Sequence, residues 1–471
     1  MNTPQLLING RLVPGSFTMP VINPATEENL IDCPRASPDQ LNEAVAAARN
    51  AFASWAATSL QQRREILLAM ADRIETNLDE LARILTQEQG KPLRGARGEV
   101  KAACGFFRYG ATLDLPEVSL EDSKSRRVTA RRKPLGVVAA ILPWNFPLLT
   151  AAAKMPGCLL AGNTMVIKPS PTTPLATLRF AELIADLVPA GVVNVITDNN
   201  DLGDLLTAHP DVRKVTFTGS TTTGRKVMRN AADSLKRVTL ELGGNDAGIV
   251  LPDADPKAIA PRIFQSVFQN SGQVCLALKR LYVHDSIYDA MCDELVTLAD
   301  KAVVGDGFKE GVELGPLQNR AQFERVKALI KDARSCGSII AGGEPVEGPG
   351  FFIRPTLVRD IKDGTRLVDE EQFGPVLPII RYYDVDDAVR LANASSYGLG
   401  GSVWGSDEAL AVELASRLEA GTVWVNKHQD ISPSIPFGGA KQSGIGVEYG
   451  RQGLEEFTQL QIVNLLPKDA G

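Results

Sequence analysis

The sequence has few cysteines and histidines, and their spacing argues against two common kinds of site. Its 471 residues include six cysteines and three histidines. No two cysteines form a C-x-x-C pair and the histidines lie far apart, so we expect neither a structural zinc site nor a disulfide framework, and no metal. Such cysteine usage is typical of a reducing compartment, and the expected location is cytoplasmic.

Long apolar runs and a strong charge of one sign are also absent. No N-terminal charged segment precedes an apolar run, and no stretch of about 18 apolar residues occurs, so we expect no signal peptide and no membrane partner. The formal net charge of −6 and a pI of 5.4 argue against broad binding to nucleic acid. Hydrophobic residues make up 44% and charged residues 23% of the chain, which is typical of a globular protein.

Residues 135–251 show the clearest organisation. Short β-rich runs alternate there with helical patterns, which indicates a parallel sheet covered by helices on both faces. Ligands bind beyond the carboxyl ends of the strands in such sheets. We therefore expect one edge of one sheet to collect the four polar or glycine-rich loops that directly follow predicted strands, at 143–145, 168–170, 218–220 and 242–244.

The remaining chain predicts further lobes, and its length predicts about three domains at roughly 150 residues each. Residues 38–54 and 60–89 have helical patterns, and residues 259–336 alternate between helix and strand, which indicates a second α/β lobe. The basic segment 123–132 has two interpretations: an exposed strand that crosses between subunits, or a solvated linker.

One thiol and one carboxylate, each beside glycine, predict covalent catalysis. Cys275 follows a Ser-Gly turn, and Glu241 precedes Leu-Gly-Gly. This pairing is typical of a nucleophile and a base acting on an electrophilic carbon. The alternative is structural, because cysteine is often inert core and most glutamates are solvated or paired.

Polar residues after the predicted strands add candidate binding groups. The amide of Asn145 is suited to stabilise an oxyanion, although an asparagine there also caps helices. The loop that begins at Gly219 departs from both the G-x-G-x-x-G and P-loop patterns, so it indicates either a phosphate site or a capped helix. Lys168 is either a ribose ligand or a surface lysine, and the acids at 370–371 are either ribose ligands or loop acids.

Seven short motifs occur in one order along the chain. They are PWNFP at 143–147, IKPS at 167–170, FTGST at 217–221, ELGG at 241–244, GQVC at 272–275, EEQFGP at 370–375 and PFGG at 436–439. With these motifs the chain resembles the NAD(P)-dependent aldehyde dehydrogenase superfamily over nearly its whole length.

The resemblance implies an α/β fold with three parts and an oligomer. A Rossmann-like cofactor-binding domain would comprise residues 1–111 and 133–244, and an α/β catalytic domain residues 245–440. A small β oligomerisation flap would comprise residues 112–132 and 452–471. The expected assembly is a homodimer or a homotetramer.

The resemblance also implies roles for individual residues. Cys275 would be the nucleophile, Glu241 the general base, and Asn145 with the backbone N–H of Cys275 the oxyanion hole. NAD, and possibly NADP, would be bound by Trp144, Lys168, Ser170, Gly219, Ser220, Gly243, Glu371 and Phe373. Lys168 would hold the adenosine ribose, Ser220 the pyrophosphate, Glu371 the nicotinamide ribose, and Phe373 would lie against the nicotinamide ring.

The implied reaction oxidises an aldehyde to a carboxylic acid through a thiohemiacetal and a thioester on Cys275, with hydrolysis by water that Glu241 activates. One alternative is an acylating dehydrogenase that passes the thioester to coenzyme A, although such enzymes usually lack the base. Another alternative is a catalytically silent structural relative, although Cys275, Glu241 and Asn145 are all retained.

Two departures from the family pattern affect these expectations. Pro171 stands where many NAD-preferring members carry a glutamate, which leaves NADP possible beside NAD. Arg451 stands where some relatives carry a second acid, which argues against proton relay through that position.

Thr150 and Ala153 are small where some relatives carry bulky groups and lie three residues apart on one helical face, and Gln269 is polar where an aromatic residue often stands. They predict a roomy, partly polar tunnel with residues 430–435 at its mouth, and a bulky or polar aldehyde in preference to acetaldehyde. The expected lining residues are Phe146, Thr150, Ala153, Gln269, Val274, Leu276 and Phe437.

Overall fold

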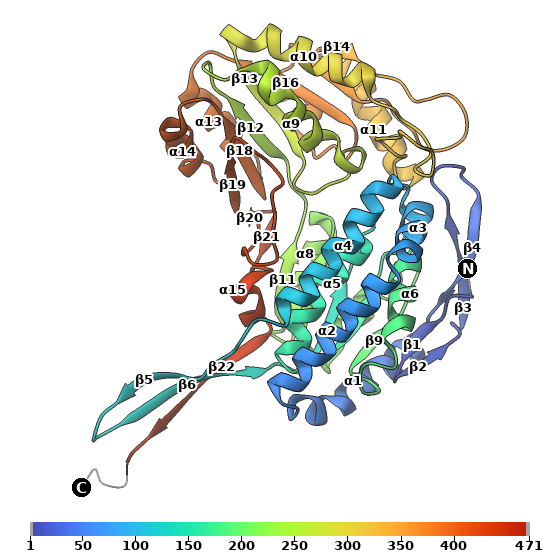
Figure 1. Cartoon of the computed structure of the whole chain (residues 1–471), viewed down its shortest axis with the longest axis vertical. Helices are drawn as coiled ribbons and strands as arrows, with labels where there is room; N and C mark the ends of the chain where they lie inside the picture. The colour runs from blue at the N-terminus through green and yellow to red at the C-terminus, as the bar shows by residue number, and fades with distance from the viewer. Residues whose placement is uncertain (1–2, 468–471) are drawn as a thin grey trace.

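Two large sheets, each flanked by helices, and a projecting three-stranded arm make up the chain (Figure 1). The computed structural model describes residues 3–467. The first sheet has the order β2-β1-β9-β8-β7-β10-β11-β21. Its strands are β1 Leu6–Ile8, β2 Arg11–Val13, β7 Val137–Ile141, β8 Thr164–Lys168, β9 Val193–Val195, β10 Val212–Thr218, β11 Arg237–Glu241 and β21 Gly444–Ile445.

The five central strands of this sheet are parallel, so their polar loops leave from the same edge. Lys168 pairs with Ile141, Ile141 with Phe217, and Thr218 with Glu241. These registers align the carboxyl ends of β8, β7, β10 and β11. The alternation between residues 135 and 251 therefore predicted the sheet and the meeting of its four loops correctly.

The helices of the first lobe bury a large common core against this sheet. Trp55, Phe107 and Phe180 are among its largest fully buried side chains. The helices are α1 Pro38–Ala56, α2 Leu60–Thr76, α3 Leu78–Gln89, α4 Leu93–Gly110, α5 Pro147–Leu160, α6 Leu175–Ile184, α7 Gly203–Ala208 and α8 Thr221–Ala232.

The first two helices begin with capping boxes, in which Ser37 with Gln40 and Ser59 with Gln62 satisfy free N–H groups. The single helix expected over 60–89 is two helices, which corrects that prediction. Asn77 leaves the helical conformation (φ −106°, ψ 21°) and its side-chain amide donates to the Arg73 carbonyl at 2.8 Å. This local hydrogen bond competes with the backbone ladder and separates α2 from α3.

The second sheet has the order β14-β15-β16-β13-β12-β18-β19 and is parallel except for the β14–β15 pair. Its strands are β12 Asp246–Val250, β13 Leu278–His284, β14 Ser338–Ala341, β15 Thr356–Arg359, β16 Val376–Tyr382, β18 Gly400–Trp404 and β19 Thr422–Val425. Its helices are α9 Pro256–Phe268, α10 Tyr288–Lys301, α11 Arg320–Ala333, α12 Arg366–Asp369, α13 Val385–Asn393 and α14 Glu408–Ser416. All of this sheet falls within residues 245–440.

After the second sheet the chain returns to the first lobe. β17 (Tyr397–Gly398) pairs with β20 (Ala440–Lys441), and β21 then pairs with β11, so that Gly444 lies beside Glu241. Shorter elements complete the described fold: the hairpin of β3 Phe17–Ile22 and β4 Asn29–Arg35, the 3-10 turns η1 Gln269–Gly272 and η2 Asp285–Ile287, and α15 Gly450–Glu455.

The arm consists of β5 (Val118–Asp122), β6 (Arg127–Pro134) and β22 (Thr458–Leu465), and it projects from the first lobe (Figure 1). The basic segment 123–132 forms the β5–β6 turn and most of β6, as the exposed-strand interpretation predicted. The expected flap also included residues 468–471, and the expected cofactor domain residues 1–2, which lie outside the described residues. Between residues 3 and 467, no helix has both the length and the hydrophobicity to cross a bilayer.

Candidate active site

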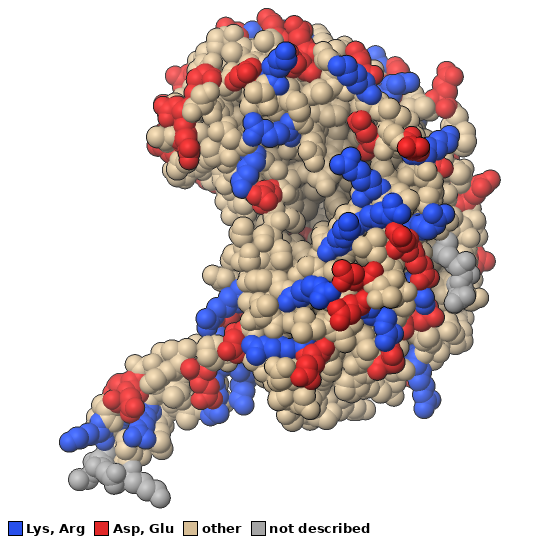
Figure 2. All heavy atoms as spheres, viewed as in Figure 1, with Lys and Arg blue, Asp and Glu red and all other residues tan. Residues whose placement is uncertain are grey.

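A cavity of about 1120 Å³ lies between the two lobes, and the surface is hollowed there (Figure 2). All three expected catalytic residues and all eight expected cofactor residues line it. Of the seven expected substrate residues, six line it: Phe146, Thr150, Gln269, Val274, Leu276 and Phe437. Ala153 does not; it lines a separate cavity of about 30 Å³, beside Phe106 and Tyr449. Residues expected from scattered motifs therefore meet in one space.

The loop before Cys275 has an unusual backbone. Asn270, Ser271 and Gly272 have φ angles of 51°, 56° and 74°, in the left-handed region. A Cβ on Gly272 would lie 2.2 Å from the Gly374 carbonyl oxygen, so no side chain fits there. Left-handed backbone at Asn270 and Ser271 is strained, and it persists only where surrounding contacts hold it in place. Backbone strain of this kind is common at functional sites.

Gln273 holds this loop in place. Its side chain is fully buried, its amide donates to the carbonyls of Asn270 (2.9 Å) and Pro316 (3.3 Å), and its Oε1 accepts from the Gln318 N–H (2.8 Å). The Ser271 hydroxyl adds a bond to the Gly315 carbonyl at 2.7 Å. The nucleophile candidate therefore sits on a rigid turn.

Burial is the main cause that raises the pKa of the Cys275 thiol to about 12, and the nearby carboxylates Glu241 and Glu371 contribute to this increase. Lys279 acts in the opposite direction: its ammonium lowers that pKa and donates to the carbonyls of Val274 (2.9 Å) and Cys275 (2.5 Å). The thiol is thus protonated at neutral pH and needs a proton acceptor before it can attack.

Glu241, at the end of β11, is buried, and neither of its carboxyl oxygens has a hydrogen-bond partner among residues 3–467. Burial raises the pKa of this carboxyl well above its usual value, the charge of Glu448 raises it further, and Lys154 lowers it. A buried carboxyl without hydrogen-bond partners destabilises the fold, so its presence here indicates a role in the site. A raised pKa suits a general base.

Sequence reasoning missed Glu448 and Lys154. Their buried side chains form an ion pair, and Thr216 bonds to both, at 2.9 Å from Lys154 Nζ and 3.2 Å from Glu448 Oε1. Arg451, which was expected at the place of a second acid, is exposed and pairs with Glu455; the buried acid lies three residues earlier in the chain. A lysine within the apolar pattern of α5 was the signal available in the sequence.

Asn145 is held by a second buried ion pair that sequence reasoning also missed. Lys91 pairs with Glu99 and donates to the Asn145 carbonyl at 2.8 Å. Glu99 also accepts the N–H groups of Leu148 and Leu149, both at 3.1 Å, which caps the start of α5. One hydrogen of the Asn145 amide goes to the Gln273 carbonyl at 2.9 Å, so the second is left for a ligand in the cavity.

The expected cofactor residues fit a dinucleotide. Ser220 caps α8 by accepting the Thr223 N–H, and the free N–H groups of this 12-residue helix face the cavity, which suits a pyrophosphate. Gly243 packs against Glu371 so closely that a Cβ would lie 2.4 Å from its carboxylate. Glu371 accepts the Gly244 N–H at 2.9 Å.

Aromatic side chains border the cavity between this cradle and Cys275. The rings of Trp144 and Phe373 meet edge to face with centroids 5.2 Å apart. Phe373 has a φ of 50°, and Gln322 fixes its carbonyl at 2.9 Å. The motif EEQFGP thus supplies both a carboxylate and a flat apolar wall.

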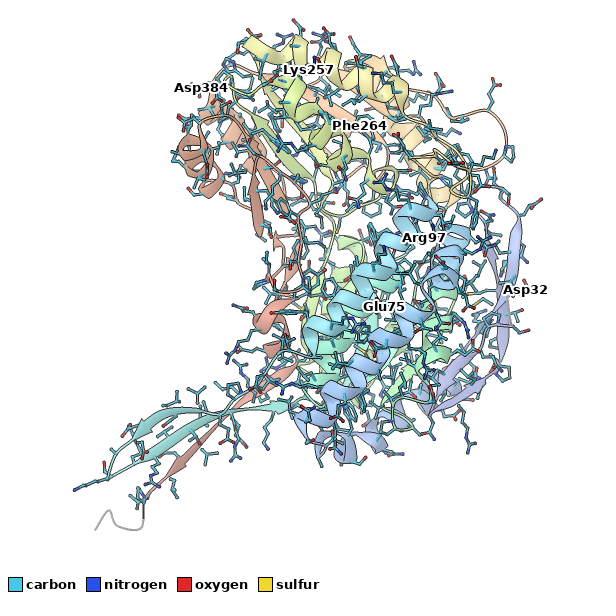
Figure 3. The ribbon with its side chains drawn as sticks, viewed as in Figure 1. Asp32, Glu75, Arg97, Lys257, Phe264 and Asp384 are labelled. Carbon is cyan, nitrogen blue, oxygen red and sulfur yellow. The ribbon has the colours of Figure 1, made fainter. Side chains whose placement is uncertain are left out.

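The part of the cavity beside α4 is wide because this helix presents small residues to it. Gly95, Gly98, Ala102 and Gly105 line this wall, and a Cβ added at any of the three glycines would meet open space. Arg97, labelled in Figure 3, belongs to the same helix but not to the lining, and it pairs with Asp79 of α3 at 2.9 Å.

The other walls of the cavity beside α4 are mainly apolar. Phe437 and Tyr449 stack with centroids 5.7 Å apart, and Phe106 meets Tyr449 at 4.8 Å. Ile431 and Pro433 come from the segment expected at the mouth. Glu99, Thr150, Gln269, Gln429 and Glu448 are the polar contributions, so polar groups are in the minority around this space.

Comparison with known proteins identifies the family of the chain. Residues 13–463 match the profile of the Aldehyde dehydrogenase family. A probable aldehyde dehydrogenase of a Pseudomonas species is 44% identical over 97% of this chain and 94% of its own length. Phenylacetaldehyde dehydrogenase of Pseudomonas fluorescens is 43% identical over 96% of this chain and 94% of its own length.

A solved structure shows the same architecture. A point mutant of betaine aldehyde dehydrogenase of Staphylococcus aureus, in complex with NAD+, aligns with a TM-score of 0.95 at 32% identity, over 98% of this chain and 97% of that chain. The α/β fold and the resemblance inferred from the seven motifs are therefore confirmed. The chain belongs to the aldehyde dehydrogenase family, and its activity is the oxidation of aldehydes with NAD(P).

Proposed function

We propose that the chain oxidises a bulky, mainly apolar aldehyde to the carboxylic acid through a covalent intermediate on Cys275, with NAD as cofactor. The observation that carries the proposal is the meeting of Cys275, Glu241 and Asn145 in one cavity with the dinucleotide cradle. Each residue has a chemical role that its surroundings support.

Addition to the aldehyde begins the reaction. Cys275 gives its proton to Glu241, whose two oxygens are free of hydrogen bonds, and the sulfur forms a bond to the carbonyl carbon. The carbonyl oxygen becomes the thiohemiacetal oxyanion. The free amide hydrogen of Asn145 and the Cys275 backbone N–H stabilise this charge without forming an ion pair.

Oxidation converts the thiohemiacetal to a thioester. The hydride acceptor for this step is supplied by the nicotinamide of the bound cofactor. Glu371, which accepts the Gly244 N–H, would hold the adjoining ribose, and Phe373 and Trp144 would form the apolar border.

Hydrolysis completes the cycle and restores the thiol. Once the proton from Cys275 has left Glu241, this carboxylate takes a proton from water, the oxygen attacks the acyl carbon, and the carbon–sulfur bond breaks to release the acid. The proton on Glu241 then passes to the departing sulfur. Lys154 and Glu448 lie close enough to alter the pKa of Glu241 and offer its proton a buried route away from the site.

The presence of the base favours hydrolysis over transfer to coenzyme A. Added coenzyme A is expected to leave the product as free acid, and formation of an acyl-CoA would contradict this.

The width of the α4 side supports a bulky substrate. The glycines and Ala102 leave space that a short aldehyde does not fill, and the rings of Phe437 and Tyr449 offer a flat apolar surface. The relative from Pseudomonas fluorescens carries phenylacetaldehyde in its name, which supports an arylalkyl aldehyde here. Each buried methylene contributes about 0.8 kcal/mol, so a filled pocket favours larger substrates strongly.

A panel of aldehydes tests this substrate class. We expect kcat/KM for phenylacetaldehyde to exceed that for acetaldehyde by at least about 10-fold. Gly98→Leu fills the open wall and is expected to lower kcat/KM for phenylacetaldehyde about 10-fold, with less than about 2-fold effect on acetaldehyde. The matched control Arg97→Leu, outside the lining, leaves both values unchanged. Acetaldehyde as the best substrate, or equal effects of the two variants, would contradict the proposal.

We also propose that the arm joins subunits in a homodimer or homotetramer. Residues Val118, Leu120, Leu460, Ile462 and Leu465 of the arm are exposed. The register places Ile462 and Val118 on either side of Ala130, so their side chains share one face. An apolar face of this kind is typical of a protein interface.

Charges on that face are expected to separate the subunits. Leu460→Asp with Ile462→Asp removes two apolar side chains worth about 1.5–3 kcal/mol each, which raises the dissociation constant by about 10²–10⁴. Light scattering after gel filtration measures the change. Gln459→Asp with Gln461→Asp places the same charges on the other face of β22 and is the matched control. An oligomer that persists after Leu460→Asp with Ile462→Asp would disprove the role of this face.

A further inference from the structure

Lys168, the residue expected to hold the adenosine ribose, is paired with a buried carboxylate. Lys168 Nζ lies 2.5 Å from Asp198 Oδ1, and the two side chains are only 5% and 0% exposed. Lys168 lines the cavity, whereas Asp198 stands behind it. The lysine therefore reaches the ligand space with its charge already balanced.

Asp198 is fixed by the start of the next helix. Its second oxygen accepts the Leu202 N–H at 3.0 Å, at the N-terminus of α7. Pro171, at the place of the family glutamate, offers no carboxylate from the other side of Lys168. The acidic neighbour of this lysine thus comes from a different loop, which no motif in the sequence had marked.

Further carboxylates surround the same end of the cavity. Asp201 and Asp204 line it beside Asn200 and Gly203. Arg35 pairs with Asp201, whereas Asp204 has no cationic partner within residues 3–467. Two other cations line the cavity: Lys226 on α8, and Arg325, which donates to the Glu371 carbonyl in the nicotinamide half.

We propose that Asp198 is the residue that selects NAD over NADP. The ammonium of Lys168 retains two hydrogens for the uncharged ribose hydroxyls, but the Lys168–Asp198 pair has no net charge with which to attract a phosphate. A 2′-phosphate, which carries up to two negative charges, would meet this neutral pair, whereas an unpaired Lys168 would attract it. The inference rests on the proposed placement of NAD in this cavity.

Equilibrium binding tests the inference without turnover. Isothermal titration calorimetry compares NAD with NADP, and ADP-ribose with its 2′-phosphate. The wild-type protein is expected to bind the ligands without the 2′-phosphate at least about 10-fold more tightly. Asp198→Asn leaves Lys168 with an unbalanced charge, so affinity for NADP is expected to rise about 10-fold, as for one partly screened charge, while affinity for NAD changes less than about 3-fold.

Two further variants make the test specific. Lys168→Met combined with Asp198→Asn is expected to lose the gain in NADP affinity, because the gain depends on the freed ammonium. Asp201→Asn, a matched control in the same loop, removes a carboxylate already paired with Arg35 and is expected to change the NADP to NAD ratio less than about 2-fold. If Asp198→Asn does not fold, Asp198→Ser replaces it.

The outcomes separate the two levels of the proposal. Wild-type protein that binds NADP as tightly as NAD overturns the role of Asp198. A gain in NADP affinity that survives loss of Lys168, or that Asp201→Asn reproduces, also overturns it. Failure to bind NAD or ADP-ribose at all would refute the proposed cofactor site instead.

Discussion

Replacement of Cys275 by alanine is expected to abolish aldehyde oxidation while NAD still binds. The reaction requires a bond between sulfur and the carbonyl carbon, and of the six free cysteines only Cys275 lines the cavity within the described residues. Loss of a nucleophile commonly lowers kcat by 10⁴-fold or more, because the remaining groups act only through it. We expect a fall of at least about 10⁴-fold.

The alanine variant leaves the surroundings intact, so its interpretation is direct. The loop is held by Gln273 and Ser271 through contacts that do not involve the thiol. Unfolding free energy is expected to change by less than about 1 kcal/mol. Cys336→Ala, at a half-buried cysteine outside the cavity, is the control and should retain full activity.

Steady-state rates of cofactor reduction and calorimetric NAD binding provide the two measurements. Activity of Cys275→Ala above about 1% of wild type would disprove the covalent route. A wild-type protein that binds NAD but is inert toward the whole aldehyde panel would support the catalytically silent relative instead.

Replacement of Glu241 by glutamine is expected to stop the cycle at the thioester. Glutamine has the same shape as glutamate but cannot accept a proton, so water attacks the acyl carbon about 10²–10⁴-fold more slowly. Cysteine can still lose its proton slowly to solvent, and one round of oxidation then proceeds. Stopped-flow measurement should show a burst of reduced cofactor close to one equivalent per site, followed by a slow phase.

The acyl-enzyme itself provides the second readout. Intact-mass spectrometry of Glu241→Gln after mixing with phenylacetaldehyde and NAD should show the mass of the acyl group on the protein, and Cys275→Ala should show neither adduct nor burst. A variant with wild-type turnover, or one that accumulates no thioester while turnover falls, would contradict the assignment of the base.

The pH dependence follows from the same carboxyl. Its pKa is raised above the usual glutamate range by burial and by Glu448. A base works only when deprotonated, so turnover of the wild type falls as pH decreases through this raised pKa, earlier than an ordinary glutamate would allow. The glutamine variant is expected to lose this acid limb.

Local pattern was sufficient for the sheet that carries the site. The loops at 168–170 and 242–244 were expected to follow strands, and β8 and β11 end at Lys168 and Glu241, because each is a short β-rich run that ends at a polar residue. Parallel pairing then required their loops to meet. Glu241 and the four loops could therefore be placed at one edge of the sheet from the sequence alone, whereas Cys275 was joined to them only by the resemblance to the family.

The supporting residues could not be found in this way, because they act through contacts between distant segments. Lys91 reaches Asn145 across 54 residues of sequence, and Lys154 reaches Glu448 across 294. No local period reveals such pairs. The helix break at Asn77 was missed for a different reason, since a single side-chain hydrogen bond overrides a strong helical pattern.

The substrate side illustrates the same limit. Thr150 and Ala153 were both expected to line the substrate space, yet only Thr150 lines the cavity, because Tyr449 and Phe106 separate the space beside Ala153 from it. The wall of α4 was overlooked, since glycines within a helix are read as weak points of the helix. Their importance depends on what faces them.

The base and the nucleophile belong to different lobes: Glu241 ends a strand of the first sheet, and Cys275 precedes a strand of the second. Only residues 242–245 connect the two sheets at this point. A small tilt of one lobe against the other would alter the alignment of these two groups while leaving both hydrophobic cores untouched. Catalytic activity is therefore expected to be lost at a lower temperature than the circular dichroism signal of the folded chain.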